Sequence, residues 1–318
     1  LLKDLSVDYF QAAVTGISAD GRTLETESGV IENDAVLIAT GGRYIKKLPG
    51  IENAITICEG IGSAERMGEK LRALQEKGGT VALGFGGNPK EPSAMRGGPM
   101  FELLFGLDTW LKKQGTRDRF RLVFFTPAPQ PGKRLGENAV SRMLGEMKKR
   151  GIETHLGHKM KSFENSVVCT EGGEIPADLI LFMTGMTGPA WIQGSPLPLS
   201  PGGMIQADAM AAVAGMERVY VAGDAGSFPG PDWMPKQAHM ADLQATAAAK
   251  NMALNLAGKP ASEKFKVELL CIIDSLDKGI LVYRGEKRNL ALPSMRPLHW
   301  TKRAFEKMYL RHFRTAGK

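Results

Sequence analysis

The first forty residues predict a β-meander that leads into a buried strand. Their apolar positions form short runs, and turn residues separate these runs at Asp20-Gly21 and Ser28-Gly29. The run AVLIAT at positions 35–40 is apolar nearly throughout, as is typical of a buried parallel strand. It ends in Thr40-Gly41-Gly42, where glycine lets a ligand approach the backbone.

The rest of the chain alternates between strand and helix patterns. Continuous apolar runs predict buried strands, and apolar positions with a 3.6-residue period predict helices. The expected strands lie within 78–89, 119–127, 152–156, 166–174, 177–183, 217–226 and 264–283. The expected helices cover 60–77, 99–113, 138–150, 235–256 and the tail from 297. This alternation predicts an α/β fold built on a parallel sheet.

Length and composition narrow the class of protein. A chain of 318 residues with 43% hydrophobic and 24% charged residues predicts a globular protein of two domains. Three cysteines without a CxxC pair exclude a four-cysteine zinc site and a disulfide-stapled scaffold. No metal-binding motif such as HExxH is present, so we expect no metal. No apolar run is long enough to span a bilayer, and the first residues do not resemble a signal peptide.

The positive charge is concentrated at the C-terminus. The net charge is +7, and positions 295–318 hold seven Lys or Arg residues and one Glu. Because the body of the chain is near neutral, we expect no nucleic-acid partner. At about 100° per residue, the tail has an apolar arc and an opposite basic arc. The apolar arc holds Leu298, Phe305, Met308, Tyr309 and Phe313, and the basic arc holds Arg303, Lys307, Arg311 and Arg314, with Trp300 among them. Such a helix lies in a membrane interface or docks on the core with a solvated basic face.

Two glycine-containing turns follow apolar strands. Gly84-Phe85-Gly86-Gly87 is GxGG without an immediately following helix, so it predicts either a pyridine nucleotide site or a degenerate relic of one. The second turn, Gly223-Asp224-Ala225-Gly226, puts a carboxylate at the carboxyl edge of a sheet, where α/β proteins bind ligands. Asp224 is equally compatible with a helix N-cap.

A helix start and three cysteines are further candidates. Lys236 stands at the start of the helix expected from Pro235, where the helix dipole and the lysine favour an anionic group; an ordinary helix start with a surface lysine is the alternative. Cys58 precedes a helix, a position that lowers the pKa of a thiol. Cys169 and Cys271 lie in strand patterns that suit buried thiols.

The order of these motifs resembles sulfide:quinone oxidoreductase, a flavoprotein family of the pyridine nucleotide-disulfide oxidoreductase superfamily. The tail LHWTKRAFEKMYLRHF resembles the membrane-attaching segment of that family. The motifs that carry the resemblance are ATGG (39–42), TICEGIGSAE (56–65), RGGPMFE (96–102), VYVAGDAG (219–226), MPKQAHMADLQA (234–245) and LLCIIDSLDKG (269–279).

The resemblance implies a chemistry and a set of site residues. Cys58 and Cys271 would be the redox pair that hydrosulfide attacks, and electrons would pass through FAD to a membrane quinone. Residues 297–314 would attach to the membrane surface, so we expect a peripheral protein of a bacterial inner membrane, compatible with a homo-oligomer. The FAD contacts would come from Thr40, Gly41, Gly223, Asp224, Lys236, Gln237 and Ala238.

The resemblance also implies an architecture of two Rossmann-like domains. We expect 1–77 and 186–265 to form an FAD domain, interrupted by a second dinucleotide-like domain at 78–185 with a degenerate NAD site. Residues 266–318 would form a C-terminal region with a redox cysteine and an amphipathic helix. The family has a GxGxxG unit before ATGG, which this chain lacks. The chain would then be a fragment, or take the adenosine site from another chain, or not hold FAD normally.

Three other functions remain open. A flavoprotein subunit of flavocytochrome c sulfide dehydrogenase would use the same cysteines with a cytochrome as acceptor. A type II NADH dehydrogenase would need an intact second glycine-rich turn and no cysteine pair. A truncated, non-catalytic paralogue would share the fold without FAD.

Overall fold

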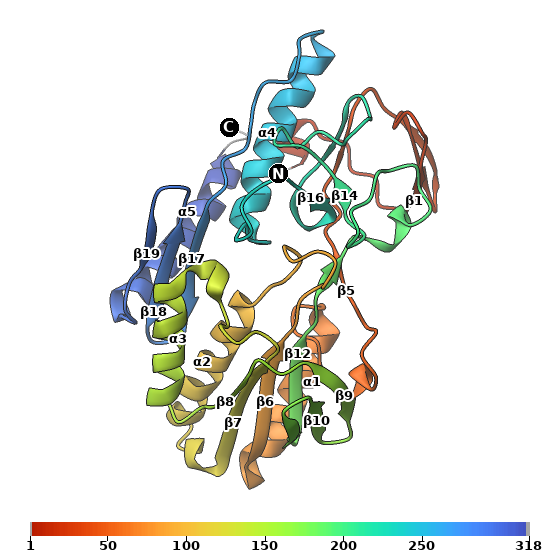
Figure 1. Ribbon diagram of the computed structural model, residues 1–318. Coiled ribbons are helices and arrows are strands. Elements are labelled where there is room, and N and C mark those ends of the chain that lie inside the picture. The colour runs from red at the N-terminus through yellow and green to blue at the C-terminus, as the bar shows by residue number, and fades with distance from the viewer. Residues whose placement is uncertain (1, 316–318) are drawn as a thin grey trace.

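The computed structural model describes residues 2–315, and for residues 3 and 312–315 it describes the backbone alone. The chain forms two α/β units joined by a narrow crossing, and a C-terminal sheet and helix lie beside them (Figure 1). The predicted α/β class is therefore confirmed. The helices are α1 (Ile61–Lys77), α2 (Gly98–Lys113), α3 (Glu137–Lys149), α4 (Ala238–Leu256) and α5 (Arg296–Thr315). The 3-10 turns are η1 (Lys3–Leu5), η2 (Ile51–Asn53), η3 (Arg117–Arg119), η4 (Lys133–Leu135), η5 (Ala190–Ile192) and η6 (Gly223–Ala225).

The first unit contains the predicted meander and a parallel strand pair. The meander strands β1 (Val14–Ile17), β2 (Thr23–Thr26) and β3 (Gly29–Glu32) are antiparallel. Strand β4 (Val36–Ile38) pairs in parallel with β15 (Val219–Val221), and β14 (Ile205–Gln206) pairs with β16 (Gly226–Ser227). Along β15, Val219 and Val221 enter the core shared with β4, whereas Tyr220 packs with the α4 side. Alternate side chains of one strand thus hold α4 against the sheet.

The second unit is a four-stranded parallel sheet in the order β12-β6-β7-β8. One face carries Leu83 and Phe85 into a core with α2 and α3, and the other carries Ala82 into a core with a three-stranded antiparallel sheet. The parallel strands are β6 (Gly79–Phe85), β7 (Phe120–Thr126), β8 (Glu153–Leu156) and β12 (Leu179–Met183). The antiparallel strands are β9 (Met160–Glu164), β10 (Val167–Thr170) and β11 (Gly173–Pro176).

The chain crosses between the two units at β5 (Arg43–Tyr44) and β13 (Met186–Thr187), which pair with each other. The helix α1 follows the first crossing, and its Leu74 packs in the core of the second unit. Ile55 also forms a parallel bridge to Leu181 of β12. The sequence predicts that the second unit begins at residue 78. The packing of Ile55 and Leu74 on that unit favours a boundary near residue 45.

The C-terminal region is a three-stranded antiparallel sheet that α5 covers. Its strands are β17 (Leu269–Asp274), β18 (Gly279–Arg284) and β19 (Asn289–Ala291). Leu269, Ile273 and Val282 share the core of α2 and α3, so this sheet is packed on the second unit. Within residues 2–315, no helix combines the length and apolar character needed to cross a bilayer.

Candidate active site

The carboxyl ends of β4 and β15 meet at one edge of the first unit. Their register pairs Ile38 with Val221, and the Ala222 amide donates a hydrogen bond to the Ile38 carbonyl at 3.0 Å. Thr40-Gly41 therefore lies beside Gly223-Asp224, at the edge where parallel sheets bind ligands. The two motifs are 183 residues apart in sequence, and the parallel pairing brings them together.

Glycine is required at this edge for two reasons. Gly41 has φ +72°, a left-handed conformation, and a Cβ placed on it would have open space around it. A Cβ on Gly42 would lie 2.8 Å from the Thr187 carbonyl oxygen. The backbone of β13 can therefore pass this close only because residue 42 has no side chain. Thr40 is exposed, and its hydroxyl accepts a hydrogen bond from Trp191 Nε1 at 3.4 Å.

Asp224 forms an ion pair with Arg96. Arg96 stands just before α2, in the second unit, and both side chains are largely buried. The Arg96 Nε is buried and has no hydrogen-bond partner within the described part of the chain. The alternative that Asp224 is a helix N-cap is not what the structure shows, because η6 has no side-chain cap.

Lys236 stands two positions before α4, and its side chain reaches the turn that carries Asp224. Its ammonium donates to the Gly226 carbonyl and lies 3.5 Å from the Gly223 carbonyl oxygen. Burial lowers the pKa of Lys236 to about 8, although the charges of Asp224 and Glu91 act in the opposite direction. This lysine can therefore exchange a proton close to neutral pH.

The start of α4 is joined to the strand that carries Cys271. Gln237 is the N-cap residue, but its side chain does not cap the helix. Its amide donates instead to the Leu270 carbonyl at 2.9 Å. Ala238 is exposed at the first helical position, later than the start predicted at Pro235. The helix start, with backbone amides that no side chain caps, thus lies beside β17.

Cys58 is exposed and adopts a left-handed backbone, with φ +62°. Such a conformation is unusual for a residue other than glycine and is enriched at functional sites. Although the residue is exposed, partial shielding of its thiol from water raises the pKa of Cys58; the Arg96 guanidinium opposes this and the Glu102 carboxylate adds to it. The expectation that a helix start lowers this pKa is therefore wrong: α1 begins only at Ile61, and burial dominates.

Cys271 lies in the middle of β17 and packs against the core of the second unit. Burial raises the pKa of Cys271 to about 11, with a further increase from Glu102 and a decrease from Lys302. Glu102 thus acts on both thiols and lies in the region of both Cys58 and Cys271. Both are free thiols in the structure.

Cys169 is separate from this group. It lies on β10, half-buried, with its thiol 3.5 Å from Glu164 Oε1. It is less buried than the sequence pattern predicts, because β10 is the middle strand of a small sheet that is open on one side.

The sequence reasoning did not single out Tyr44, Arg96, Glu102 and Lys302 as site residues. Burial raises the pKa of Tyr44, and the negative charge of a Cys58 thiolate raises it further. Lys302 of α5 forms an ion pair with Glu102. The motif RGGPMFE could have indicated two of them, because Arg96 and Glu102 flank the start of α2 in it.

The glycine-rich turn after β6 is filled by the protein itself. A Cβ on Gly185 would lie 2.3 Å from the Asn88 amide nitrogen, so the returning chain rests on this turn. The side-chain amide of the buried Asn88 donates through Nδ2 to the Met186 carbonyl at 2.9 Å and to the Gly202 carbonyl at 3.1 Å. As predicted, no helix follows the turn directly, since α2 begins at Gly98.

Sequence comparisons relate the chain to oxidoreductases. A model of the pyridine nucleotide-disulphide oxidoreductase family matches residues 113–245. The chain is 25% identical to a sulfide-quinone reductase of Aquifex aeolicus, over 98% of this chain and 76% of that protein. It is 22% identical to a type II NADH:quinone oxidoreductase of Staphylococcus aureus, over 96% of this chain and 77% of that protein.

Solved structures share the fold. The sulfide:quinone oxidoreductase of Aquifex aeolicus aligns with a TM-score of 0.85 and 24% identity, covering all of this chain and 78% of that one. An engineered water-forming NADPH oxidase aligns with a TM-score of 0.60 and 16% identity, over 85% of this chain and 57% of that one. The predicted resemblance to sulfide:quinone oxidoreductase is therefore confirmed, in sequence and in fold.

Proposed function

We propose that this chain, which resembles sulfide-quinone reductase along nearly its whole length, oxidises sulfide with FAD and a quinone. The observation that carries the proposal is that Glu102, whose charge acts on both thiols, lies at the start of α2 close to Arg96, the partner of Asp224. Cys58 and Cys271 are 213 residues apart in sequence, yet the charge of Glu102 affects the pKa of both. Through Arg96, the same region joins the edge that carries Asp224.

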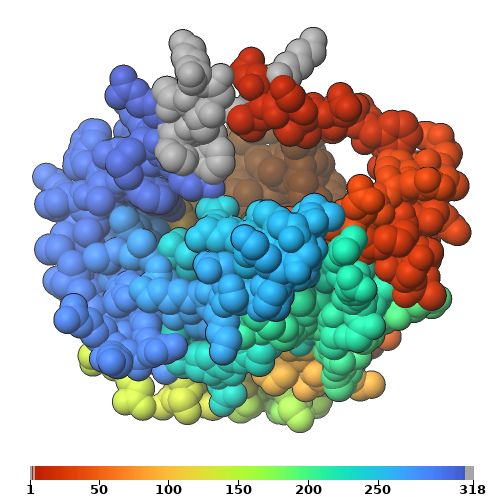
Figure 2. Space-filling model, turned by 90° about the horizontal axis from the view of Figure 1, so that it is seen from above, coloured from red at the N-terminus to blue at the C-terminus, as the bar shows by residue number. Residues whose placement is uncertain are grey.

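The residues at this edge fit a flavin. The Arg96 Nε has no acceptor within the described residues, and space is open in front of Gly41. The surface is also hollowed between the N-terminal segment and α4 (Figure 2). We infer that Thr40, Gly41, Gly223, Asp224, Lys236, Gln237 and Ala238 hold the cofactor. Lys236 and the start of α4 would stabilise negative charge on its ring. When bound, FAD supplies the two-electron acceptor that the thiols lack.

The cysteines would carry the sulfur chemistry as a disulfide. Hydrosulfide attacks one sulfur and forms a persulfide, while the disulfide bond breaks and the other cysteine leaves as a thiolate. The sulfur is thereby oxidised by two electrons, to the level of polysulfide. A second hydrosulfide would remove the outer sulfur as a polysulfide, which leaves both cysteines as thiols. Their return to the disulfide would release two electrons through FAD to one quinone, which takes up these two electrons and two protons to give a quinol. Arg96 would stabilise a thiolate at Cys58, because its charge favours the ionised form.

The site of quinone reduction would lie at a membrane surface. Trp300, Phe305 and Met308 of α5 are 51–63% exposed, and basic residues accompany them. We infer that α5 attaches the protein to the inner membrane of a bacterium, as a peripheral protein that is compatible with a homo-oligomer. The predicted attachment segment 297–314 includes Phe313 and Arg314, whose side chains lie outside the described residues, as does Lys318.

The test is a visible absorption spectrum of the purified chain, followed by anaerobic addition of sulfide. We expect a flavin band that sulfide bleaches and that a short-chain quinone restores. Cys58→Ser and Cys271→Ser should slow the bleaching by at least about 100-fold. Cys169→Ser is the matched control, and it should bleach at close to the wild-type rate.

Each alternative predicts a different spectrum. Bleaching by NADH and not by sulfide would indicate an NADH dehydrogenase, although the filled turn at Asn88 argues against it. Recovery with a cytochrome and not with a quinone would indicate the flavocytochrome subunit. A colourless protein that takes up no added FAD would indicate either the non-catalytic paralogue or a fragment that needs a further FAD-binding unit. Full activity of Cys58→Ser would contradict the role of that thiol.

A further inference from the structure

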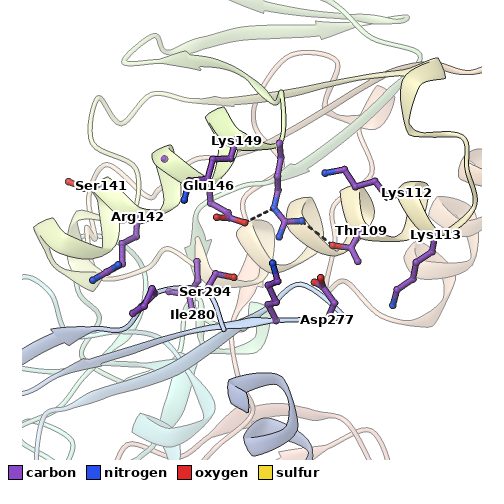
Figure 3. Close-up of a pocket in the computed structure, with 14 residues that line it drawn as sticks. Thr109, Lys112, Lys113, Ser141, Arg142, Glu146, Lys149, Asp277, Ile280 and Ser294 are labelled. Atoms are coloured by element: carbon purple, nitrogen blue, oxygen red, sulfur yellow. Dashed lines mark hydrogen bonds and ion pairs between the residues drawn. The ribbon is translucent and has the colours of Figure 1, made fainter. Parts of the chain in front are cut away.

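A cavity of about 760 Å³ lies between α2, α3 and the turn that joins β17 to β18 (Figure 3). It is formed where the C-terminal sheet meets the helices of the second unit. It lies apart from the edge that carries Asp224, and none of the residues proposed above lines it. Its walls are Thr109, Lys112, Lys113, Ser141, Arg142, Gly145, Glu146, Lys149, Arg150, Asp277, Lys278, Ile280, Pro293 and Ser294.

The cavity wall is strongly basic. Six cationic side chains line it, against two carboxylates. Both carboxylates already have partners: Glu146 binds Arg150 Nε at 3.0 Å, and Asp277 accepts from Ser275 Oγ at 2.9 Å. The cations therefore outnumber the negative charges available to them, and a concave wall of one sign attracts counter-ions.

For four of these six cationic residues, the fold itself explains why a basic residue stands at that position. Lys112 and Lys113 lie in the last turn of α2 and Lys149 in the last turn of α3, where they complement the helix dipole. Arg150 is bound to the buried Asp108 at 3.0 Å. These residues would be basic even without a ligand.

Arg142 and Lys278 have no such reason. Arg142 lies in the first half of α3 and Lys278 in the β17–β18 turn, so neither complements a helix C-terminus. In the part of the chain described, neither side chain forms a hydrogen bond or ion pair. They line the same cavity from two different elements, α3 and the hairpin. Lys278 is half-buried, which makes a charge without a partner more costly, whereas Arg142 is exposed.

We propose that this cavity binds a phosphate-bearing anion, either free or as the headgroup of a lipid. Arg142 offers a fork that suits phosphate oxygens, and lysines supply further charge. Thr109, Ser141 and Ser294 add hydroxyl groups to the wall. Ile280 and Pro293 are the apolar side chains on the wall, and all the other side chains that line it carry a charge or a hydroxyl group. An anion held between Arg142 and Lys278 would join α3 to the hairpin that carries Cys271.

The direct test is titration calorimetry of the 318-residue chain with pyrophosphate, at about 100 mM salt, where the Debye length is about 10 Å. We expect saturable binding that Arg142→Gln with Lys278→Gln weakens at least about 10-fold. The matched control is Lys70→Gln with Lys148→Gln, which removes the same charge from exposed positions outside the cavity. The control should bind like the wild type.

A second measurement separates the two sources of phosphate. If the ligand is a lipid headgroup, a smaller fraction of the Arg142/Lys278 variant than of the wild type should float with phosphatidylglycerol vesicles. If the ligand is a free anion, the two fractions should be equal. The proposal is overturned if neither pyrophosphate nor vesicle binding depends on this pair, or if the control pair has the same effect. Neither readout uses sulfide or flavin, and the calorimetry uses no membrane, so its outcome is independent of the proposed function. Vesicle binding through α5 is common to the wild type, the Arg142/Lys278 variant and the control, so only the difference between them counts.

Discussion

The ammonium group of Lys236 is shielded from water, and this makes the free energy of unfolding depend on pH. Folding lowers its pKa from 10.5 to about 8 because burial penalises the ammonium. Between these pH values the unfolded chain binds more protons than the folded chain, so the free energy of unfolding rises as pH increases. Cys271 acts in the opposite direction, since burial raises its pKa from 9.0 to about 11 and stability falls through that window.

We therefore predict that Lys236→Met removes a rise in stability between pH 7 and pH 9. Below pH 9 the lysine titrates before the buried thiol does, and the wild type should gain about 1 kcal/mol more than the variant. Urea unfolding at the two pH values measures this difference. Lys250→Met, an exposed lysine of the same helix, is the control and should show the wild-type rise. A rise of equal size in Lys236→Met would contradict the assignment.

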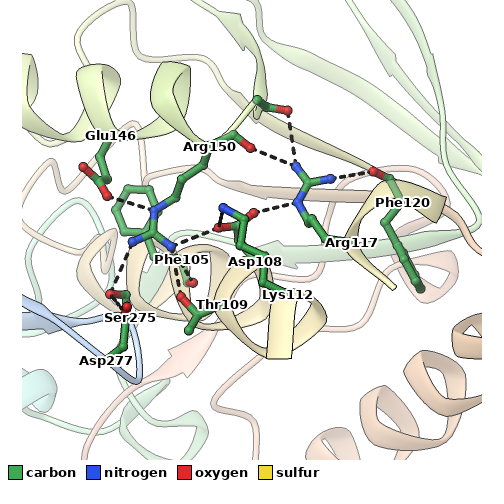
Figure 4. A network of polar contacts seen from close by, with 11 residues as sticks. Phe105, Asp108, Thr109, Lys112, Arg117, Phe120, Glu146, Arg150, Ser275 and Asp277 are labelled. Atoms are coloured by element: carbon green, nitrogen blue, oxygen red, sulfur yellow. Dashed lines mark hydrogen bonds and ion pairs between the residues drawn. The ribbon is translucent and has the colours of Figure 1, made fainter. Parts of the chain in front are cut away.

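At the scale of elements, one buried carboxylate joins α2, α3 and the C-terminal hairpin (Figure 4). Asp108 of α2 is fully buried and binds Lys112 at 2.8 Å, Arg117 at 2.6 Å and Arg150 at 3.0 Å. Arg150 also donates to Ser275 Oγ at 3.4 Å, beyond the end of β17. The strand that carries Cys271 is thus held against α3 by this network.

Asp108→Asn should destabilise the protein by about 3–5 kcal/mol, because it leaves Arg117 as a largely buried charge without a carboxylate and leaves Arg150 with Glu146 alone. The asparagine keeps the shape of the side chain, so the loss reports charge and not a cavity. Glu153→Gln is the matched control: its pair with Arg121 is 41–45% exposed, and the loss should stay below about 1 kcal/mol. Urea unfolding of both variants distinguishes the two cases, and equal losses would refute the role of Asp108.

The elements themselves were largely predictable, because long apolar runs and helical periods are local signals. The five helices and the strands β4, β6, β7, β12 and β15 lie within the predicted ranges or close to them. The strands β5, β13, β14 and β16 were missed, since each has two residues and depends on a distant partner. Strands β9 and β19 were missed as well, and β11 lies two residues later than expected.

The candidate site was predictable only in part, for a similar reason. Gly223 and Asp224 end a buried strand, which is a local pattern. The Arg96–Asp224 ion pair spans 128 positions and joins two units, so no local pattern indicates it. The Lys302–Glu102 ion pair spans 200 positions and likewise depends on where α5 docks.

At the scale of the whole molecule, α5 is docked by one side and exposed along the other. Leu298 is buried, Lys302 binds Glu102, and the Tyr309 hydroxyl donates to Asp242 at 2.8 Å. Trp300, Phe305 and Met308 are 63%, 51% and 63% exposed, although Phe305 and Met308 were expected on one arc with Leu298. The structure therefore shows the docked alternative for the tail, and the exposed apolar side chains beside the basic residues leave membrane attachment as a proposal.

Replacing Trp300, Phe305 and Met308 together by Gln should weaken binding to vesicles of anionic lipid at least about 10-fold, because insertion of an apolar strip drives interfacial binding. Flotation measures the bound fraction. The control replaces Val30 and Ile61, which are 65% and 79% exposed on other elements, by Gln. If the strip attaches the protein, the control floats like the wild type, and sulfide oxidation with a soluble quinone survives in both. If both variants lose flotation equally, exposed apolar residues act without regard to position, and α5 is not the attachment site.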